Sequence, residues 1–541
     1  MPKCHFFFCQ GISKDNHLSV LQTSLKALEI NPTCRTLKSR VLSDIVLVHS
    51  DDILLEETAD GFTLSFGLTQ EERATLRSQN FVEGYNWAST YAEKNQWLYL
   101  FHHKTKKETW LLSDRTGAWP VFIHHENERL TLSSEPQPLI VSLCDEKKAL
   151  KWNREAILEF LSFGVTLDSK TLFQEISLLP QNTYLHFKEG YLKTVSPSTY
   201  GKKNTSLSLE EKLEKFHSLF TIALEDKFNF ESLTHMTLTG GSDSRLMLFA
   251  TPEHVRNQTT YWFDHECGIS HEEAQEELEA IQPLVEKFRL NFHLGYPDQK
   301  GFPSFLTEQS DSDRYRAFDA DFHGKTLTGI YGTELLSGAC LSLKERFQTK
   351  LALEDELTTS AKTLLAETKL KFCNQLLENE ISSLAPLTYR SFLTDLYQSP
   401  IWGNPWVQAK RKPTPFLHPE IVSFLFSLNS SDLKDYHFTY HYLKKFFPEA
   451  LKSPFASSLN FHYELPKLKA KQTPSTVTKS PPPSPILSDE DSIKLGEILC
   501  ELEIFDRSNI KKALNIPELQ YRYFLLSRWY LLNPKIIGAN C

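Results

Sequence analysis

The sequence has few of the features that mark secreted, membrane or metal-binding proteins. Its nine cysteines are an odd number, and none stands in a Cys-x-x-Cys pair or in a His-rich spacing, which argues against a disulfide framework and a zinc site. No stretch holds 18 uninterrupted apolar residues, so no membrane span is predicted. The apolar residues from Phe6 to Cys9 are too few for a signal peptide and fit a first strand. We therefore expect a cytoplasmic protein without a membrane partner.

An excess of charge of one sign is also missing. The net charge is −9 over 541 residues, so nothing favours nucleic acid as the main ligand. Hydrophobic residues make up 40% and charged residues 23% of the chain, the balance of a soluble globular protein. The length predicts two or more domains. A homo-oligomer is compatible with these numbers but is not required by them.

The first part of the chain has the pattern of packed antiparallel sheets. Short alternating runs are separated by polar turns, and they lie at 97–101, 109–112 and 129–132. The composition turns polar at 200–205. We therefore predict a first domain over residues 1–200.

The second predicted domain, residues 205–541, begins with alternating strands and helices. Strands are expected at 236–238, 259–263 and 291–294, and helices at 244–250 and 270–288. This alternation predicts a parallel α/β sheet with crossover helices. From about 351 to 532 the periodicity is mostly helical, except at 467–488, where Pro, Ser, Thr and Lys predict a disordered insertion.

A glycine-rich loop follows the first of these parallel strands. Its residues are Leu238, Thr239, Gly240, Gly241, Ser242, Asp243 and Ser244. The glycines would permit a turn that side chains obstruct, and N–H groups at the next helix start favour an anion. Asp243 could hold Mg²⁺, and the Thr239 and Ser244 hydroxyls could donate to phosphate oxygens. A Gly-Gly turn can be purely structural, but the Asp-Ser spacing favours phosphate.

This loop resembles the SGGxDS loop of asparagine synthetases, β-lactam synthetases and lasso-peptide cyclases, and Arg245 makes it similar to the LTGGxDSR branch. Further stretches resemble the same family in the same order: 113–122, 132–135 and 171–180 of its glutaminase domain, then 415–419, with His418 for Asp, and 442–448. The resemblance implies an α/β protein in two parts. The first is a class II glutaminase-like antiparallel β-sandwich flanked by helices. The second is an adenine nucleotide α-hydrolase-like parallel α/β domain with extra helices.

The glutaminase nucleophile of that family is missing at its usual place. Class II glutaminases use a cysteine directly after the initiator Met, with its own α-amine as base. Here that position is Pro2, and Cys4 lies further in. The family's NGEIYN strand is also unrecognisable near 61–66. We expect an inactive glutaminase fold; the alternative, Cys4 exposed by cleavage, would make a glutamine-hydrolysing asparagine synthetase.

A second family loop resembles residues 327–338. By this resemblance Thr328 and Gly329 contact the nucleotide, and Glu334 falls where the family has a metal-binding Asp. Mg²⁺ would then lie between Asp243 and Glu334. Adenine is expected against the strand tips at Leu238 and Tyr261 to Phe263, mainly through main-chain contacts.

The resemblance also suggests catalytic residues. Tyr331 stands where β-lactam synthetases have a Tyr that pairs with a later Glu, and Glu367 or Glu380 could be that partner; a packing role is the alternative. The family's RxKxGF stretch is out of register after Pro448, so Lys444, Lys445 or Lys452 could replace its cation, with a solvated helix-end charge as the alternative. We therefore predict catalytic roles for Tyr331, Glu367 and Lys452.

Together these features predict an ATP- and Mg²⁺-dependent amide-forming ligase. It would adenylate a small-molecule or peptide carboxylate and transfer the acyl group to ammonia or a substrate amine. A non-catalytic nucleotide-binding relative is the remaining alternative.

Overall fold

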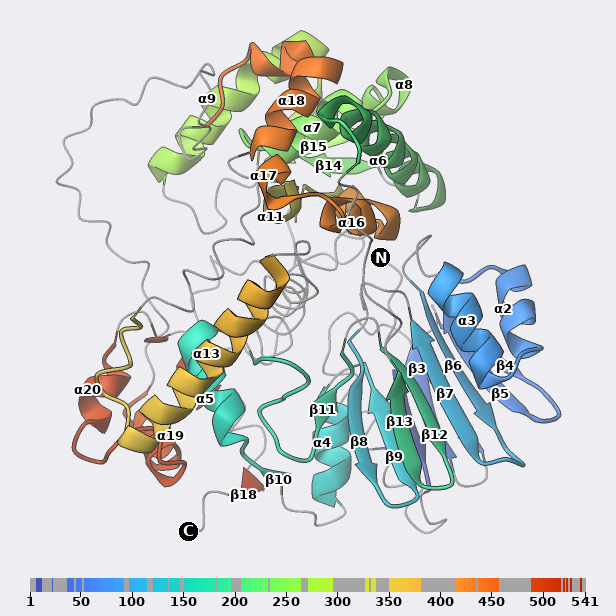
Figure 1. Ribbon diagram of the computed structural model, residues 1–541, viewed down its shortest axis with the longest axis vertical. Helices are drawn as coiled ribbons and strands as arrows, with labels where there is room; N and C mark the ends of the chain where they lie inside the picture. Colours follow the sequence, from blue (N-terminus) through green and yellow to red (C-terminus); the bar gives the residue numbers. More distant parts are fainter. Residues whose placement is uncertain are drawn as a thin grey trace.

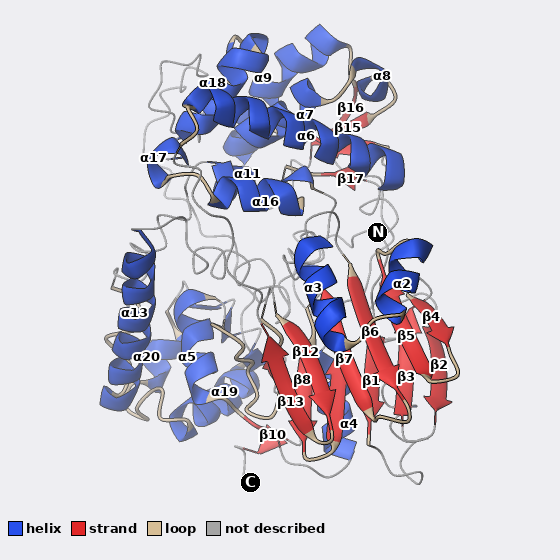
Figure 2. Cartoon of the chain, turned by 45° about the vertical axis from the view of Figure 1, so that its right-hand side comes forward, coloured by secondary structure: helices blue, strands red, loops and turns tan. Residues whose placement is uncertain are grey.

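The structure of the protein is a computed structural model of the 541-residue chain. It describes residues 6–11, 22, 37–42, 45–50, 53–91, 97–113, 120–134, 136–145, 150–164, 166–180, 183–195, 206–231, 234–263, 271–294, 326–329, 332–336, 350–380, 414–433, 436–456, 488–516, 519–520, 522–523, 526–527 and 536–537. Figures 1 and 2 show two antiparallel sheets, a parallel sheet with its helices, and a further group of helices beside the antiparallel sheets.

Two six-stranded antiparallel sheets form the N-terminal sandwich, in the orders β11-β8-β9-β1-β3-β2 and β13-β12-β7-β6-β5-β4. Their strands are β1 (Phe6–Gln10), β2 (Leu37–Leu42), β3 (Ile45–Ser50), β4 (Leu54–Glu57), β5 (Gly61–Phe66), β6 (Leu98–His103), β7 (Glu108–Ser113), β8 (Phe122–Glu126), β9 (Arg129–Ser133), β11 (Ser177–Leu178), β12 (Tyr184–Lys188) and β13 (Tyr191–Val195). Side chains alternate between the faces of a strand. Phe6 and Phe8 therefore lie in the core between the sheets, whereas Phe7 and Cys9 lie in the core on the other side.

Helices cover the outer face of each sheet and complete four layers (Figure 2). α4 (Pro136–Asp145) and α5 (Arg154–Phe163) share a core with β1 and β3. α2 (Gln70–Arg77) and α3 (Phe81–Tyr91) cover the other sheet, where Trp97, Tyr99 and Trp110 form an aromatic cluster. These layers confirm the predicted antiparallel sandwich flanked by helices.

The second part is built on a four-stranded parallel sheet in the order β16-β15-β14-β17. Its strands are β14 (His235–Thr237), β15 (Thr260–Phe263), β16 (Asn291–Leu294) and β17 (Thr326–Leu327). Its helices are α6 (Leu209–Glu231), α7 (Ser242–Ala250), α8 (Glu253–Arg256), α9 (His271–Phe288), α11 (Gly332–Leu336), η3 (Pro415–Leu417), α16 (Pro419–Phe426), α17 (Ser430–Leu433), α18 (His437–Phe446) and η5 (Pro448–Leu451). A capping box, whose Ser-x-x-Glu spacing is visible in the sequence, starts α6: Glu211 N–H donates to Ser208 Oγ at 3.3 Å and Ser208 N–H to Glu211 Oε2 at 2.8 Å. The predicted parallel α/β fold with extra helices is confirmed.

A third group of elements comes from the C-terminal part of the chain but packs on the N-terminal part. It contains α13 (Thr359–Glu380), α19 (Asp489–Glu501) and α20 (Ile510–Leu514), and β18 (Ile536–Ile537) pairs in parallel with β10 (Leu150–Lys151). Leu365 and Leu499 share one core with Trp152 and Leu158. A single domain over 205–541 does not anticipate this packing. The boundary at 200–205 lies outside the described residues and stays a prediction.

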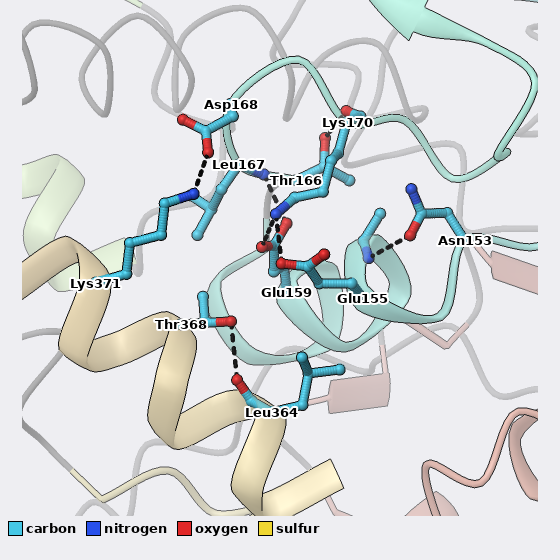
Figure 3. A network of polar contacts seen from close by, with 11 residues as sticks. Asn153, Glu155, Glu159, Thr166, Leu167, Asp168, Lys170, Leu364, Thr368 and Lys371 are labelled. Carbon is cyan, nitrogen blue, oxygen red and sulfur yellow. Dashed lines mark hydrogen bonds and ion pairs between the residues drawn. The ribbon is translucent and has the colours of Figure 1, made fainter. Parts of the chain in front are cut away.

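Polar contacts join α13 to the N-terminal part next to this core (Figure 3). Lys371 Nζ on α13 donates to Asp168 Oδ2 at 2.9 Å. In the same loop, Lys170 Nζ lies 2.6 Å from Glu159 Oε1, and Leu167 N–H donates to Glu159 Oε2 at 2.9 Å. Glu159 is 1% exposed. The loop after α5 therefore has a buried charge on one side and α13 on the other.

The sequence also predicted that the chain has no membrane span and that it has a disordered insertion at 467–488. Over the described ranges, no helix is long and apolar enough to cross a membrane. The predicted insertion at 467–488 lies outside the described residues except for Ser488, which caps α19 by accepting the Asp491 N–H at 3.1 Å.

Candidate functional site

The loop that leaves β14 is held by hydrogen bonds within itself. Leu238 continues the strand by donating its N–H to the Trp262 carbonyl at 2.9 Å. Thr239 N–H donates to Ser244 Oγ at 3.0 Å, and the Ser244 hydroxyl donates to the Thr239 carbonyl at 2.9 Å. Gly241 N–H donates to Thr239 Oγ1 at 3.3 Å. The Ser244 hydroxyl, expected to donate to phosphate, is buried and fixes the shape of the loop in this structure.

The two loop glycines have different surroundings. Neither has a positive φ, so the obstruction expected for a side chain in this turn can come only from neighbouring atoms. A Cβ on Gly240 would lie 2.9 Å from Ala280 Cβ and 3.0 Å from Ala456 Cβ, whereas a Cβ on Gly241 would have, among the described residues, only Thr239 Oγ1 within 4 Å. Close packing therefore requires glycine at 240. We call the Gly240 side the back of the loop and the Gly241 side its front.

The front of the loop is the N-terminus of α7. Gly241 is the N-cap of this helix, and no side chain caps it. The first N–H groups of a helix lack partners within the helix, and the helix dipole favours an anion there. Asp243 lies in this first turn, where its Oδ1 accepts the Ser242 hydroxyl at 3.0 Å. The front therefore combines an anion-binding helix end with one carboxylate.

The loop after β17 lies against the front. β14 and β17 are parallel neighbours, so both loops leave the same edge of the sheet. A Cβ on Gly332 would lie 2.5 Å from Asp243 Cγ, and a Cβ on Gly329 would lie 3.1 Å from Asp243 Cβ. The Asp243 side chain therefore rests on the backbone of the second loop. The structure thus brings together the two loops that the sequence suggested.

Several predicted nucleotide contacts are buried side chains. Leu238 and Phe263 both lie in the hydrophobic core of the parallel sheet, so they can reach a ligand only through their main chain, as expected. Thr328 is buried as well. Tyr331 and the side chain of Glu334 lie outside the described residues, and their roles stay predictions.

The other two catalytic candidates, Glu367 and Lys452, lie on α13 and directly after η5. Glu367 is exposed on α13, one turn before Lys371, which contacts the N-terminal part. The Lys452 side chain is 69% exposed and pairs with Glu449. Within the described part of the chain, no hydrogen bond or ion pair joins Glu367 or Lys452 to the loop. Their catalytic roles remain untested predictions.

Two charged residues that were not assigned to the site contact the loop and its neighbour. Glu277 on α9 accepts the Gly240 N–H. Arg245 is 0% exposed. It donates at 2.6 to 3.1 Å to the carbonyls of Ala450, Ser453 and Pro454. The same segment reaches the loop, because Ala456 N–H donates to the Gly240 carbonyl at 3.3 Å.

Burial and a neighbouring charge act on Arg245 in opposite directions. Burial lowers the pKa of its guanidinium to about 9, while the Glu277 charge acts to raise it. Arg245 therefore stays protonated at neutral pH, and its Cζ lies 3.7 Å from the centre of the Phe455 ring, a cation–π contact. Glu277 and Ala280 lie on one face of α9 at i, i+3 spacing, and both approach Gly240, but this spacing alone does not identify the loop as their partner.

The stretches that resemble a glutaminase domain meet β1. Phe6 N–H donates to Ser134 Oγ at 3.0 Å, and the Ser133 hydroxyl donates to the Phe6 carbonyl at 3.1 Å. Thr171 begins the last such stretch and donates its hydroxyl to the Ile176 carbonyl at 2.7 Å. Cys4 and residues 114–119 lie outside the described residues, so the predicted nucleophile position is not described.

Comparison with known proteins gives one sequence match. Residues 86–200 match a glutamine amidotransferase domain. This stretch includes β6 to β13 and agrees with the glutaminase-like resemblance of the first domain. It is less than half of the chain, so the match concerns that domain. No curated protein matches the sequence.

Two solved structures are similar to the chain at a low level. One is glutamine phosphoribosylpyrophosphate amidotransferase from B. subtilis complexed with ADP and GMP: 11% identity, 43% of this chain, 60% of that chain and a TM-score of 0.24. The other is described as the allosteric regulatory enzyme of purine biosynthesis: 10% identity, 56% of this chain, 82% of that chain and a TM-score of 0.25. This chain therefore spans less than two thirds of the first enzyme. Scores this low support no conclusion about function.

Proposed function

We propose that the protein is an ATP-dependent amide-forming ligase that adenylates a carboxylate and passes the acyl group to ammonia or an amine. One observation carries this proposal. The loop of Thr239 to Ser244 and the backbone at Gly329 and Gly332 meet at the carboxyl ends of two adjacent parallel strands, with Asp243 between them. Open parallel sheets bind ligands at this edge.

The residues present fit a nucleotide phosphate with Mg²⁺. Within the described ranges, Gly241 borders open space and the first turn of α7 has no side-chain cap, so its N–H groups can receive an anion. Asp243 offers the kind of oxygen that Mg²⁺ prefers, and we propose Glu334 as the second ligand. Leu238, Phe263 and Thr328 would contact the nucleotide through their main chain.

The proposed reaction has two steps. A carboxylate oxygen of the substrate bonds to the α-phosphorus of ATP, and pyrophosphate leaves toward the front of the loop. The nitrogen of ammonia or an amine then bonds to the acyl carbon, AMP leaves, and the nitrogen loses a proton. We propose Tyr331 with Glu367 for that proton, and Lys452 for the developing charge.

The first domain is proposed to be a glutaminase fold that does not hydrolyse glutamine, because Pro2 precedes Cys4 in the sequence. The match over 86–200 favours a second candidate function, a glutamine-hydrolysing asparagine synthetase. Glutamine hydrolysis that disappears in Cys4→Ala would support this second function. A cytoplasmic location suits either reaction.

Pyrophosphate exchange tests the first function. The purified full-length protein is incubated with ATP, Mg²⁺, labelled pyrophosphate and single carboxylates, starting with aspartate. We expect label to enter ATP with at least one carboxylate, and Asp243→Asn to reduce the rate at least 100-fold while ATP still binds weakly. Asn keeps the oxygen that accepts the Ser242 hydroxyl, so the loop should keep its shape. ATP binding without exchange for any carboxylate would indicate a non-catalytic nucleotide-binding relative, and no binding would reject the proposal.

A further inference from the structure

The phosphate loop is closed at the back and open at the front. At the back, Gly240 is enclosed by Ala280 of α9 and Ala456 of the C-terminal segment, whose Cβ atoms would lie within about 3 Å of an added Cβ. At the front, an added Cβ on Gly241 would have only a side-chain oxygen of the loop itself within 4 Å, counted over the part of the chain that the structure describes. A phosphate group can therefore approach the front, whereas protein atoms occupy the back.

A carboxylate beside an anion-binding loop needs an explanation. Glu277 accepts the N–H of Gly240, and a negative charge there would repel phosphate if it faced the same side. It does not compete for the phosphate position, because Gly240 is buried at the back. From there it fixes the direction of the Gly240 peptide and leaves the front to the helix end.

Arg245 acts on the carbonyl of Gly240, through the segment that contains Ala456. Its guanidinium donates to three carbonyls between 450 and 454 and stacks on Phe455. The segment held in this way presents Ala456 N–H to the Gly240 carbonyl. Both polar atoms of the Gly240 backbone are thus bound from the back, one by Glu277 directly and one through Arg245.

We propose that Glu277 and Arg245 are positioning residues that hold the phosphate loop from the back and set the direction of its front N–H groups toward a nucleotide phosphate. This inference rests on the proposed ATP-dependent function. Neither residue touches the substrate in it. The Arg245 charge also offsets that of Glu277, so the back of the loop adds little net repulsion toward an anion at the front.

Hydrogen exchange of the full-length protein without nucleotide tests the contact itself. In Glu277→Ala we expect the peptide that contains Gly240 to exchange about tenfold faster, since a hydrogen bond to a charged group is lost. Glu277→Gln keeps an acceptor oxygen and should change the rate less than threefold. Glu286→Ala is the matched control, because Glu286 is exposed on the same helix and its side chain accepts from the exposed Gln282. Equal rates in wild type and Glu277→Ala would reject the proposal.

Steady-state kinetics of the ATP-dependent reaction distinguish a positioning role of Glu277 and Arg245 from a purely structural one. We expect Glu277→Ala and Arg245→Lys to raise the KM for ATP about tenfold with kcat changed less than threefold, because a misaligned loop weakens ground state and transition state alike. Arg245→Lys should also speed exchange at Ala456, since one ammonium cannot serve three carbonyls. Faster hydrogen exchange of the Gly240 peptide together with an unchanged KM for ATP would overturn this inference but not the proposed function. A wild-type protein that binds no ATP would overturn the proposed function, and the inference with it.

Discussion

Among the residues that the structure describes, the two most deeply buried charged side chains lie one in each of the main parts. Arg245 is 0% exposed and Glu159 is 1% exposed. Arg245 binds three main-chain carbonyls and an aromatic ring. Glu159 binds the Lys170 ammonium at 2.6 Å and the Leu167 N–H at 2.9 Å. The first charge is satisfied mainly by neutral groups, and the second mainly by an opposite charge.

The pKa values of these two buried side chains determine how each region responds to pH. Arg245 keeps its proton at neutral pH, because its lowered pKa is still about 9. Burial raises the pKa of Glu159 to about 7, although the Lys170 charge acts to lower it. Lys170 has a second partner, Glu155, at 2.8 Å, so it remains paired when Glu159 takes up a proton. The candidate site therefore has a fixed charge at its back, whereas the junction with α13 lies beside a charge that titrates.

The largest expected effect comes from Arg245→Met. This change leaves three carbonyls without their donor and removes the contact with Phe455. Each buried group without a partner destabilises by about 1–3 kcal/mol, so we expect a loss of about 3–5 kcal/mol. Urea unfolding followed by hydrogen exchange would measure it separately in peptides of the parallel sheet. A loss below about 1 kcal/mol, or an equal loss in the sandwich peptides, would contradict this assignment.

Glu159→Gln should change the dependence of stability on pH. The folded pKa of about 7 lies above the ordinary value of 4.5 for a glutamate side chain, so the folded protein binds more protons than the unfolded chain between these pH values. The contribution of Glu159 is therefore fully present below about pH 4.5 and is lost as pH rises to about 7. Gln cannot titrate. We expect it to match wild type near pH 5 and to gain stability relative to wild type, by at most about 3 kcal/mol, near pH 8.

Thermal unfolding from pH 5 to 8 would measure this difference. Other titrating groups cancel when wild type and variant are compared at each pH. Protection of the loop near Arg245 should show no matching change over this range, because Arg245 does not titrate there. A variant that loses stability relative to wild type as pH rises would show that the Lys170 pair outweighs burial.

The two loop glycines give a matched pair of smaller effect. Gly240→Ala would place a Cβ against Ala280 and Ala456, and such overpacking typically destabilises by about 1–3 kcal/mol. Gly241→Ala would meet only Thr239 Oγ1 among the described residues, at an ordinary φ of −78°, and should change stability by less than about 0.5 kcal/mol. The measurement is the thermal midpoint of each variant, together with its Kd for ATP. Equal effects of the two substitutions would contradict the front and back assigned to the loop.

The local pattern of the site could be predicted from the sequence, because it depends on residues close in the chain. Strand alternation, the Ser208 capping box and the loop at the end of β14 all follow from spacings of a few residues. The partners of the loop could not be predicted. Glu277 is 37 residues from Gly240, and the carbonyls that Arg245 binds are more than 200 residues away.

The packing of the third group of helices could not be predicted from the sequence, for a similar reason. The periodicity of α13 shows that it buries one face, but not which core receives it. Leu365 packs with the N-terminal part and not with the parallel sheet that precedes it in the chain. The obstruction expected for a side chain at Gly240 is present, but the residues that cause it, Ala280 and Ala456, lie far along the chain and could not be identified from the sequence.

The smallest expected effect comes from Lys371→Met, which removes the ion pair with Asp168. The side chains of Lys371 and Asp168 are 51% and 28% exposed, and exposed pairs typically contribute about 0–1 kcal/mol. Leu365→Ala on the same helix removes a buried side chain and should destabilise by about 2–5 kcal/mol. Urea midpoints and hydrogen exchange of α13 would compare the two. If Lys371→Met released α13 as strongly as Leu365→Ala, charge rather than apolar contact would hold this helix, and the buried Glu159 beside it would become part of that attachment.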